Sequence, residues 1–223
     1  MTFVVTFVEG VTLDKWRRRW SERVTDVELD LRLVEVVHQL DGLRDGTAAM
    51  GFVRDLAEAD RDGLHHIPLY REVPVVVVHR EHPAAAYDEV PVADLADEIV
   101  LDDPALETRL KVETVAAGTG VVYLPMSVAR VHHRKDVVAV PVTGLPESQV
   151  GLAWRTDLDD PAVDTFVGIV RGRTPHSSRG EAAAQPQQAK QQRQQRPTSR
   201  APRRQPRKDA PGKRSGGGRR HRG

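Results

Sequence analysis

The pattern of apolar and polar positions is organised around residues 64–86, LHHIPLYREVPVVVVHREHPAAA, with four valines in a row at positions 75–78. This run has neither the apolar stripe of a helix nor the polar alternation of a half-exposed strand. It therefore predicts a strand buried on both faces, as in a sheet covered by helices. Strand and helix signals alternate before the run and start again after it. We interpret it as the crossover between two α/β lobes.

The segment before the crossover predicts a strand over residues 3–8, ended by Glu9-Gly10. A helix follows, with Thr12 as its N-cap and four apolar residues on one face, namely Leu13, Trp16, Trp20 and Val24. Residues 27–36 predict a strand, residues 38–45 a short helix and residues 48–53 another strand. Because such crossovers are right-handed, this order predicts a parallel sheet, with a ligand-binding edge at the carboxyl ends of its strands.

The segment after the crossover predicts a smaller set of elements. Residues 92–98 predict a helical turn, residues 99–101 a short strand and residues 106–117 a helix ended by Gly118. A strand over 121–124, a helix over 126–133 and two strands over 137–142 and 149–154 follow. Asp160-Pro161 is a typical start for a last helix, because proline suits the first helical position.

Charge divides the chain into two different kinds of polymer. Up to Val170 there are 17 Lys/Arg and 30 Asp/Glu, and from Arg171 to the end there are 16 Lys/Arg and two acidic residues. Beyond Thr174 the chain consists largely of Gln, Arg, Pro, Gly and Ser, which cannot bury enough apolar surface to offset the entropy of ordering. We expect residues 174–223 to be a disordered, Arg/Gln/Pro-rich basic tail on an acidic globule.

The chain has no cysteine, which excludes disulfides, thiolate metal sites and thiol nucleophiles and agrees with a reducing compartment. Its start, MTFVVTFVEG, has too short an apolar run for a signal peptide and lacks a basic region. No apolar run approaches the length of a membrane span. We expect a soluble protein of the cytoplasm with no membrane contact.

Candidate catalytic and metal-binding residues are few. Three histidine pairs occur, but adjacent histidines on a strand point to opposite faces and no further ligand pattern completes a site; they are His65-His66, His79 with His82, and His132-His133. Gly118-Thr119-Gly120 follows a helix and precedes a strand, which suits a helix end and turn rather than a phosphate loop. Ser127 lacks the flanking glycines of a nucleophile elbow, and an N-cap role is favoured. We expect no metal, no cofactor and no enzymatic activity.

Four segments carry a family resemblance: FVEGVT at the first strand end, LRDGTAAMGFVR at 43–54, PLYREVPVVVVHREHPAA at 68–85 and AAGTGVVYLPMSVAR at 116–130. Together they resemble the effector-binding domain of LysR-type transcriptional regulators, over residues 2–173. The resemblance implies a fold like that of type 2 periplasmic binding proteins, with two Rossmann-like lobes and a small molecule in the cleft. Lobe one would comprise about 1–78 and 150–173, and lobe two about 79–149.

Matching the family's motifs also implies ligand contacts, at Gly10, Val11, Thr12, Val53 and Arg54 in lobe one and at Pro125, Met126 and Ser127 in lobe two. Thr12 and Ser127 are placed by the pattern at helix N-termini, where free N–H groups and the dipole favour an anion. With Arg54 nearby, a small carboxylate is the preferred effector.

The resemblance also has departures. The family's DNA-reading head precedes the effector domain, whereas here the first strand starts about two residues after Met1. The second lobe has one helix before Val112 where the family has a helix, a strand and a further helix. The first hypothesis is therefore an effector-sensing domain without its own DNA-reading head, acting through a homodimer or a partner.

A second hypothesis assigns the function to the tail. Its basic residues lie among Gln, Pro and Gly without aromatics, so they would bind nucleic-acid phosphates with little sequence preference. The residues concerned are Arg203, Arg204, Arg207, Lys208, Lys213, Arg214, Arg219 and Arg220. A solubilising tail, or one that pairs with the acidic body, is the simpler interpretation. A third hypothesis is a gene product that has lost its ligand.

Overall fold

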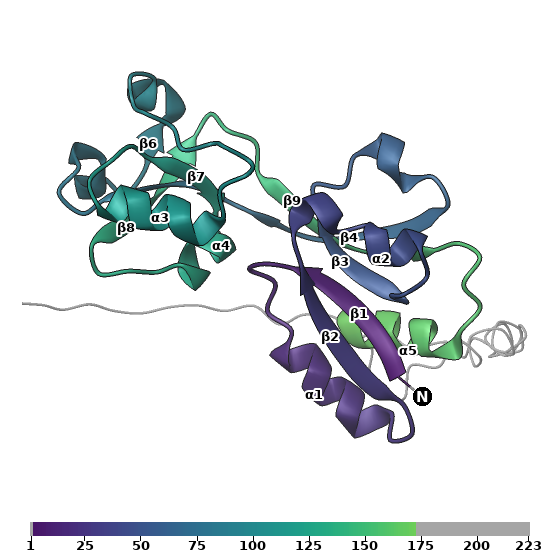
Figure 1. The fold of residues 1–223 in the computed structure, drawn as a ribbon. Coiled ribbons are helices and arrows are strands. Elements are labelled where there is room, and N and C mark those ends of the chain that lie inside the picture. The colour runs from purple at the N-terminus through teal and green to yellow at the C-terminus, as the bar shows by residue number, and fades with distance from the viewer. Residues whose placement is uncertain (1, 173–223) are drawn as a thin grey trace, which may run out of the picture. The chain divides into compact units, whose positions relative to one another are not determined.

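Two β-sheets organise the protein in the computed structural model, which describes residues 2–172. Figure 1 shows helices beside each sheet, and the chain passes between the two sheets through β4 and β5 and returns through β9. The two-lobed α/β architecture expected from the sequence is confirmed. The predicted tail lies outside the described residues.

The first sheet has five strands in the order β2-β1-β3-β9-β4. Their bounds are β1 Thr2–Val8, β2 Glu28–Val34, β3 Met50–Arg54, β4 Leu64–Glu72 and β9 Ser148–Arg155. Strand β1 is parallel to both β2 and β3, which confirms the predicted parallel arrangement, and β9 runs antiparallel to β3 and β4. The carboxyl ends of β1 and β2 therefore lie at one edge of the sheet.

Aromatic rings form the core of the first lobe. Its helices are α1 Asp14–Arg23, α2 Asp41–Arg44 and α5 Pro161–Val170, with the 3-10 turns η1 Val36–His38 and η2 Glu58–Arg61. Phe3 stacks on Trp20 with ring centroids 5.1 Å apart, and Trp16 stacks on Phe52 at 4.7 Å. The edge of Phe166 meets Trp20 and Phe52. The apolar face predicted for the first helix is thus packed against the sheet and α5.

The second sheet has four strands in the order β6-β8-β5-β7. The bounds in this lobe are β5 Pro74–His79, β6 Val90–Pro91, β7 Val122–Pro125, β8 Val137–Thr143, α3 Thr108–Ala116, α4 Met126–Val131, η3 Pro83–Ala86 and η4 Val92–Leu95. All four valines of β5 are at most 2% exposed. Val75 and Val77 pack into one cluster and Val76 and Val78 into another. The prediction of a strand buried on both faces is confirmed.

The border between the lobes differs from the expected one. The valine run pairs with β7 and β8, so β5 belongs to the second sheet and the two sheets divide at Val73. The expected border, at about residue 78, lies at the end of the run, because an apolar run does not itself show with which of two sheets it pairs. The expected end of the domain at 173 stays a prediction.

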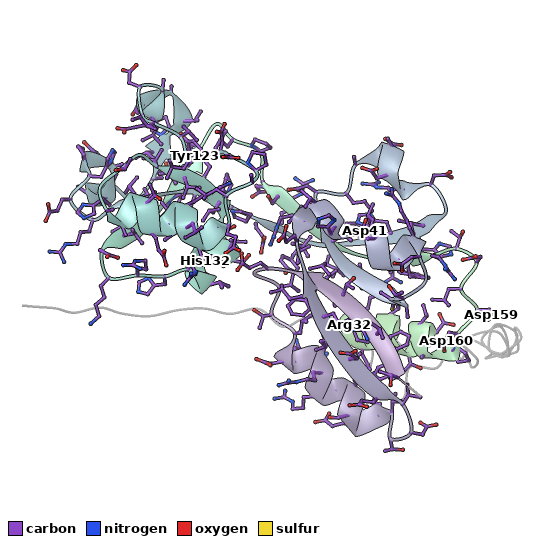
Figure 2. The ribbon with its side chains drawn as sticks, in the orientation of Figure 1. Arg32, Asp41, Tyr123, His132, Asp159 and Asp160 are labelled. Carbon is purple, nitrogen blue, oxygen red and sulfur yellow. The ribbon has the colours of Figure 1, made fainter. Side chains whose placement is uncertain are left out.

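Two predicted helix caps are wrong and one is confirmed. Helix α1 begins at Asp14 after Leu13, and the exposed Thr12 makes no cap hydrogen bond. Ser127 is the second residue of α4, whose N-cap position is taken by Pro125. Asp160, labelled in Figure 2, does cap α5, since its Oδ1 accepts a 2.8 Å hydrogen bond from the Ala162 N–H.

Some short elements are also corrected. Of the helix expected over 38–45, only Asp41–Arg44 is α-helical, and the strand expected over 99–101 is reduced to a single bridge between Val100 and Val121. Both segments are too short for periodicity to separate a helix or strand from a turn.

Candidate functional site

A cavity of about 570 Å³ lies at the carboxyl edge of the first sheet, where β1 and β2 end. Lobe one contributes Glu9 and residues 33–37, and lobe two contributes residues 104–109, Lys111 and His132. The volume falls within the range of small-molecule sites, about 300–1,000 Å³. A second hollow of about 580 Å³ beside the end of α1 draws its walls from lobe one alone. The first cavity is therefore the candidate site.

The lobe-one wall of this cavity is largely apolar and open. Leu33 is 60% exposed, Val36 45% and Val37 73%, although all three are large apolar residues. Large apolar side chains grouped at a concave surface are typical of a binding site. This wall can pack against the apolar body of a ligand.

The charged groups of the cavity come from both lobes. Glu9 and Glu35 lie on the lobe-one side, and Glu107, Arg109 and Lys111 on the lobe-two side. Arg109 is paired with Glu113 at 3.6 Å. The Lys111 ammonium makes no ion pair among the described residues, so its charge is available to a ligand.

One hydrogen bond at the cavity joins the two lobes. His132 follows α4 and is labelled in Figure 2. Its Nε2 lies 2.8 Å from the Glu9 Oε1, although the residues are 123 positions apart. An ionised carboxylate only accepts hydrogen bonds, so the Nε2–H of His132 donates. The end of β1 and the end of α4 are thereby tied together.

Arg54, an expected ligand contact, lies in a polar seam between the lobes. It is 5% exposed, and its Nε and Nη2 donate to Glu72 Oε2 at 3.2 and 2.8 Å. Its Nη1 donates to the Glu9 carbonyl at 2.9 Å, and its Nη2 approaches the Ser127 Oγ at 3.4 Å. The guanidinium charge is therefore already matched by the Glu72 carboxylate.

Gly10 and Ser127, two further expected contacts, lie against each other. Gly10 has a φ of +89°, and a Cβ at this position would overlap the Ser127 Oγ. Only glycine adopts this backbone freely and leaves room for the serine. The structure thus brings Gly10, Arg54 and Ser127 together beside the cavity rather than in its lining.

The other expected contacts are placed elsewhere. Val11 and Val53 are buried core residues, at 7% and 0% exposure. Pro125 pairs with Pro74 across the β5–β7 ladder, and the Met126 N–H donates to the Val73 carbonyl at 3.0 Å. Their roles in ligand binding stay predictions. The same holds for Thr12 and for the three residues brought together between the lobes, Gly10, Arg54 and Ser127.

Tyr70 shows the effect of the seam's charge on a neighbouring group. Burial of the ring and, next, the Glu72 carboxylate raise the pKa of Tyr70 to about 12, against a smaller opposing effect of Arg54. The residue is nevertheless 37% exposed, so solvent screens part of this interaction.

The cavity-lining residues were not identified from the sequence. A signal was available in Leu33-Val34-Glu35-Val36-Val37, because apolar residues continue past the end of a strand at the edge where ligands bind. Lys111 and His132 had no such signal, since the folding of lobe two brings them to this edge.

Residues 2–172 also bear on metal binding and membrane insertion. There, no group of three or more His, Cys, Asp or Glu side chains is arranged to hold a metal ion. In the same residues no helix has the length and apolar character needed to cross a membrane. The expected nucleic-acid contacts, Arg203 to Arg220, lie outside the described residues.

Solved structures resemble this fold at low sequence identity. A variant of the BenM effector binding domain matches with a TM-score of 0.67 and 20% identity, over 76% of this chain and 93% of that one. BenM effector binding domain with benzoate matches at 0.66 and 19%, over 76% and 90%. A mutant OxyR regulatory domain from Pseudomonas aeruginosa matches at 0.62 and 19%, over 77% and 96%. Comparison with curated proteins gave no match.

One protein family matches most of this chain. The LysR substrate binding domain family matches residues 3–105 and 105–175, well over half of the chain. The matching structures confirm the expected fold of type 2 periplasmic binding proteins. The chain belongs to the LysR substrate binding domain family, the effector-binding domains of LysR-type transcriptional regulators.

Proposed function

We propose that this domain senses a small carboxylate that binds in the cavity between the lobes. The observation that carries the proposal is the pairing of an open apolar wall, Leu33, Val36 and Val37, with the Lys111 ammonium across one cavity. A molecule with an apolar body and one acid group matches both walls. The structural neighbour BenM is described with benzoate as its effector, a molecule of this kind.

The cavity has room for such an effector. Its volume of about 570 Å³ lies within the range of small-molecule sites, and an aromatic or branched aliphatic acid fits in it. The proposed role is regulatory and not enzymatic, and it is exercised in the cytoplasm. A homodimer, expected from the family resemblance, is part of the same proposal and is tested by sedimentation equilibrium.

A thermal-shift screen of the full chain tests the proposal. Benzoate and short aliphatic acids are compared with benzamide, which has the shape of benzoate without its charge. A ligand that binds only the folded state raises Tm, so a carboxylate should raise it more than its amide does. Lys111→Gln should reduce this difference.

Lys135→Gln is the matched control, because Lys135 is exposed in the same lobe and does not line the cavity. If amides and acids shift Tm equally, or if both lysine variants behave alike, the carboxylate site is contradicted.

A second candidate function is non-specific nucleic-acid binding by the C-terminal segment. It is favoured by the charge division, since 16 Lys/Arg follow Val170 while acidic residues predominate before it. Mobility shifts of the full chain on duplexes of unrelated sequence should then weaken steeply with salt. A variant with Arg203, Arg204, Arg207 and Lys208 changed to Gln should show a smaller salt dependence. Strong preference for one sequence would contradict this candidate.

A further inference from the structure

The hydrogen bond between His132 and Glu9 lies in the wall of the cavity where the effector is proposed to bind. Both residues line the cavity, and their side chains are only 14% and 32% exposed. The Nε2–H of His132 is a donor aimed at a carboxylate, as an effector acid group requires. In this structure the carboxylate that it meets belongs to the protein.

The main chain and the side chain of Glu9 are held in different ways. The Glu9 carbonyl accepts from the buried Arg54, and Gly10 beside it is fitted against Ser127. The Glu9 carboxylate, in contrast, has the His132 Nε2 as its single hydrogen-bond partner among the described residues. Rotation about the Glu9 side chain would therefore move this carboxylate to solvent while the loop stays in place.

We propose that Glu9 is a built-in competitor for the effector, since its carboxylate occupies the place on His132 that the effector's acid group takes. This inference rests on the proposed function and names the residue that opposes effector binding at that site. An incoming carboxylate replaces one charge-assisted hydrogen bond with another and gains the attraction of Lys111. A neutral molecule of the same shape replaces it with a weaker bond and is excluded.

When the effector replaces Glu9 on His132, a hydrogen bond between the two lobes is broken. Among the described residues, the 3.4 Å hydrogen bond of Arg54 to Ser127 and the packing of Gly10 against Ser127 still join the lobes when Glu9 is displaced. Effector binding therefore changes the contacts of Glu9 at the end of β1 and of His132 at the end of α4 at the same time. This gives the domain a way to respond to an acid and not to its amide.

Titration calorimetry of the full chain with benzoate and benzamide tests the inference. Glu9→Gln keeps the shape of the side chain and removes its charge, and it should bind benzoate about tenfold more tightly than the wild type, since charged hydrogen bonds are roughly twice as strong as neutral ones. Glu9→Ala should show a gain at least as large. Benzamide, which must displace the same hydrogen bond, should also bind both variants more tightly than it binds the wild type.

Glu35→Gln is the matched control. Glu35 lines the same cavity, so its loss changes the cavity charge equally, but it has no hydrogen bond to His132. Its effect on benzoate affinity should be well below that of Glu9→Gln. A gain of the same size in both variants would reduce the role of Glu9 to general repulsion and overturn the inference.

The outcomes separate the inference from the proposed function. If the wild type binds benzoate in preference to benzamide and Glu9→Gln binds it no better, the inference is overturned and the proposed function stands. If binding appears only when Glu9 is replaced, the inference is supported in its strongest form. If neither the wild type nor any variant prefers benzoate to benzamide, the proposed function is contradicted and the inference falls with it.

Discussion

The two lobes are built from different core residues. In the first lobe, Phe3, Trp16, Trp20, Phe52 and Phe166 form a continuous cluster of stacked and edge-on rings. The two clusters of the second lobe contain mainly valine and alanine, and no ring pair occurs there among the described residues.

This difference bears on how the cavity works. Large rings fill space with few, well-defined packings, whereas small aliphatic residues gain less from each contact. The lobe-one wall of the cavity therefore belongs to the lobe whose core is more rigidly packed. We expect adjustment to a ligand to come mainly from the lobe-two wall, residues 104–111, where α3 begins.

The largest effect should follow removal of a ring from the first lobe. Phe166 is fully buried between Phe3, Trp20 and Phe52. Phe166→Ala should lower the free energy of unfolding by about 3–5 kcal/mol, because it loses both transfer energy and the contacts around the new cavity. Urea unfolding followed by circular dichroism measures this, and a loss below that caused by a lobe-two valine would break the comparison.

The polar seam should give the next largest effect. Arg54→Met leaves the Glu72 carboxylate buried without its partner and should cost about 3 kcal/mol in the same unfolding measurement. The double variant Arg54→Met with Glu72→Met should recover most of the loss, because neither charge is then buried. If the single and double variants are equally destabilised, the ion pair is not the cause.

A smaller effect is expected in the second lobe. Val77 is 2% exposed in the cluster that packs β5 against α3. Val77→Ala removes two methyl groups and should cost roughly 2 kcal/mol. Hydrogen exchange should show the loss mainly in β5, β7 and β8. Equal loss of protection in β1 and β3 would mean that the lobes unfold as one unit.

The smallest effect concerns alkaline pH. Because the pKa of Tyr70 is raised to about 12, the folded protein holds this proton at a pH where the unfolded chain has released it. The resulting stability is complete below pH 10 and is lost as pH rises toward 12. Absorbance titration of the tyrosinate should show a late step that Tyr70→Phe removes. A titration unchanged by that substitution would contradict the assignment.

The sequence predicted the fold better than it predicted the site. The valine run of β5 and the Asp160 cap of α5 depend on residues that are neighbours in the sequence and not on contacts between distant segments. Both predictions are confirmed. Thr12 and Ser127 have the right residue type for a cap, but Leu13 and Pro125 occupy the cap positions. Residue type favours a cap without fixing the residue at which the helix begins.

The site depended on contacts between distant segments. The match to the family's motifs implied a ligand contact at Arg54, and its pairing with Glu72 arises only when β3, β9 and β4 assemble. The Glu9–His132 hydrogen bond likewise needs both lobes in place. No local pattern along the chain carries such information.

Hydrogen exchange of the full chain tests the central claim most directly. The acid that raises Tm most in the thermal-shift screen is added, and peptides with and without it are compared. The account predicts slower exchange in residues 33–37 and 104–111, the two walls of the cavity, with little change in the buried strands β1 and β3. Protection confined to the hollow beside α1, around residues 24–29, would contradict it.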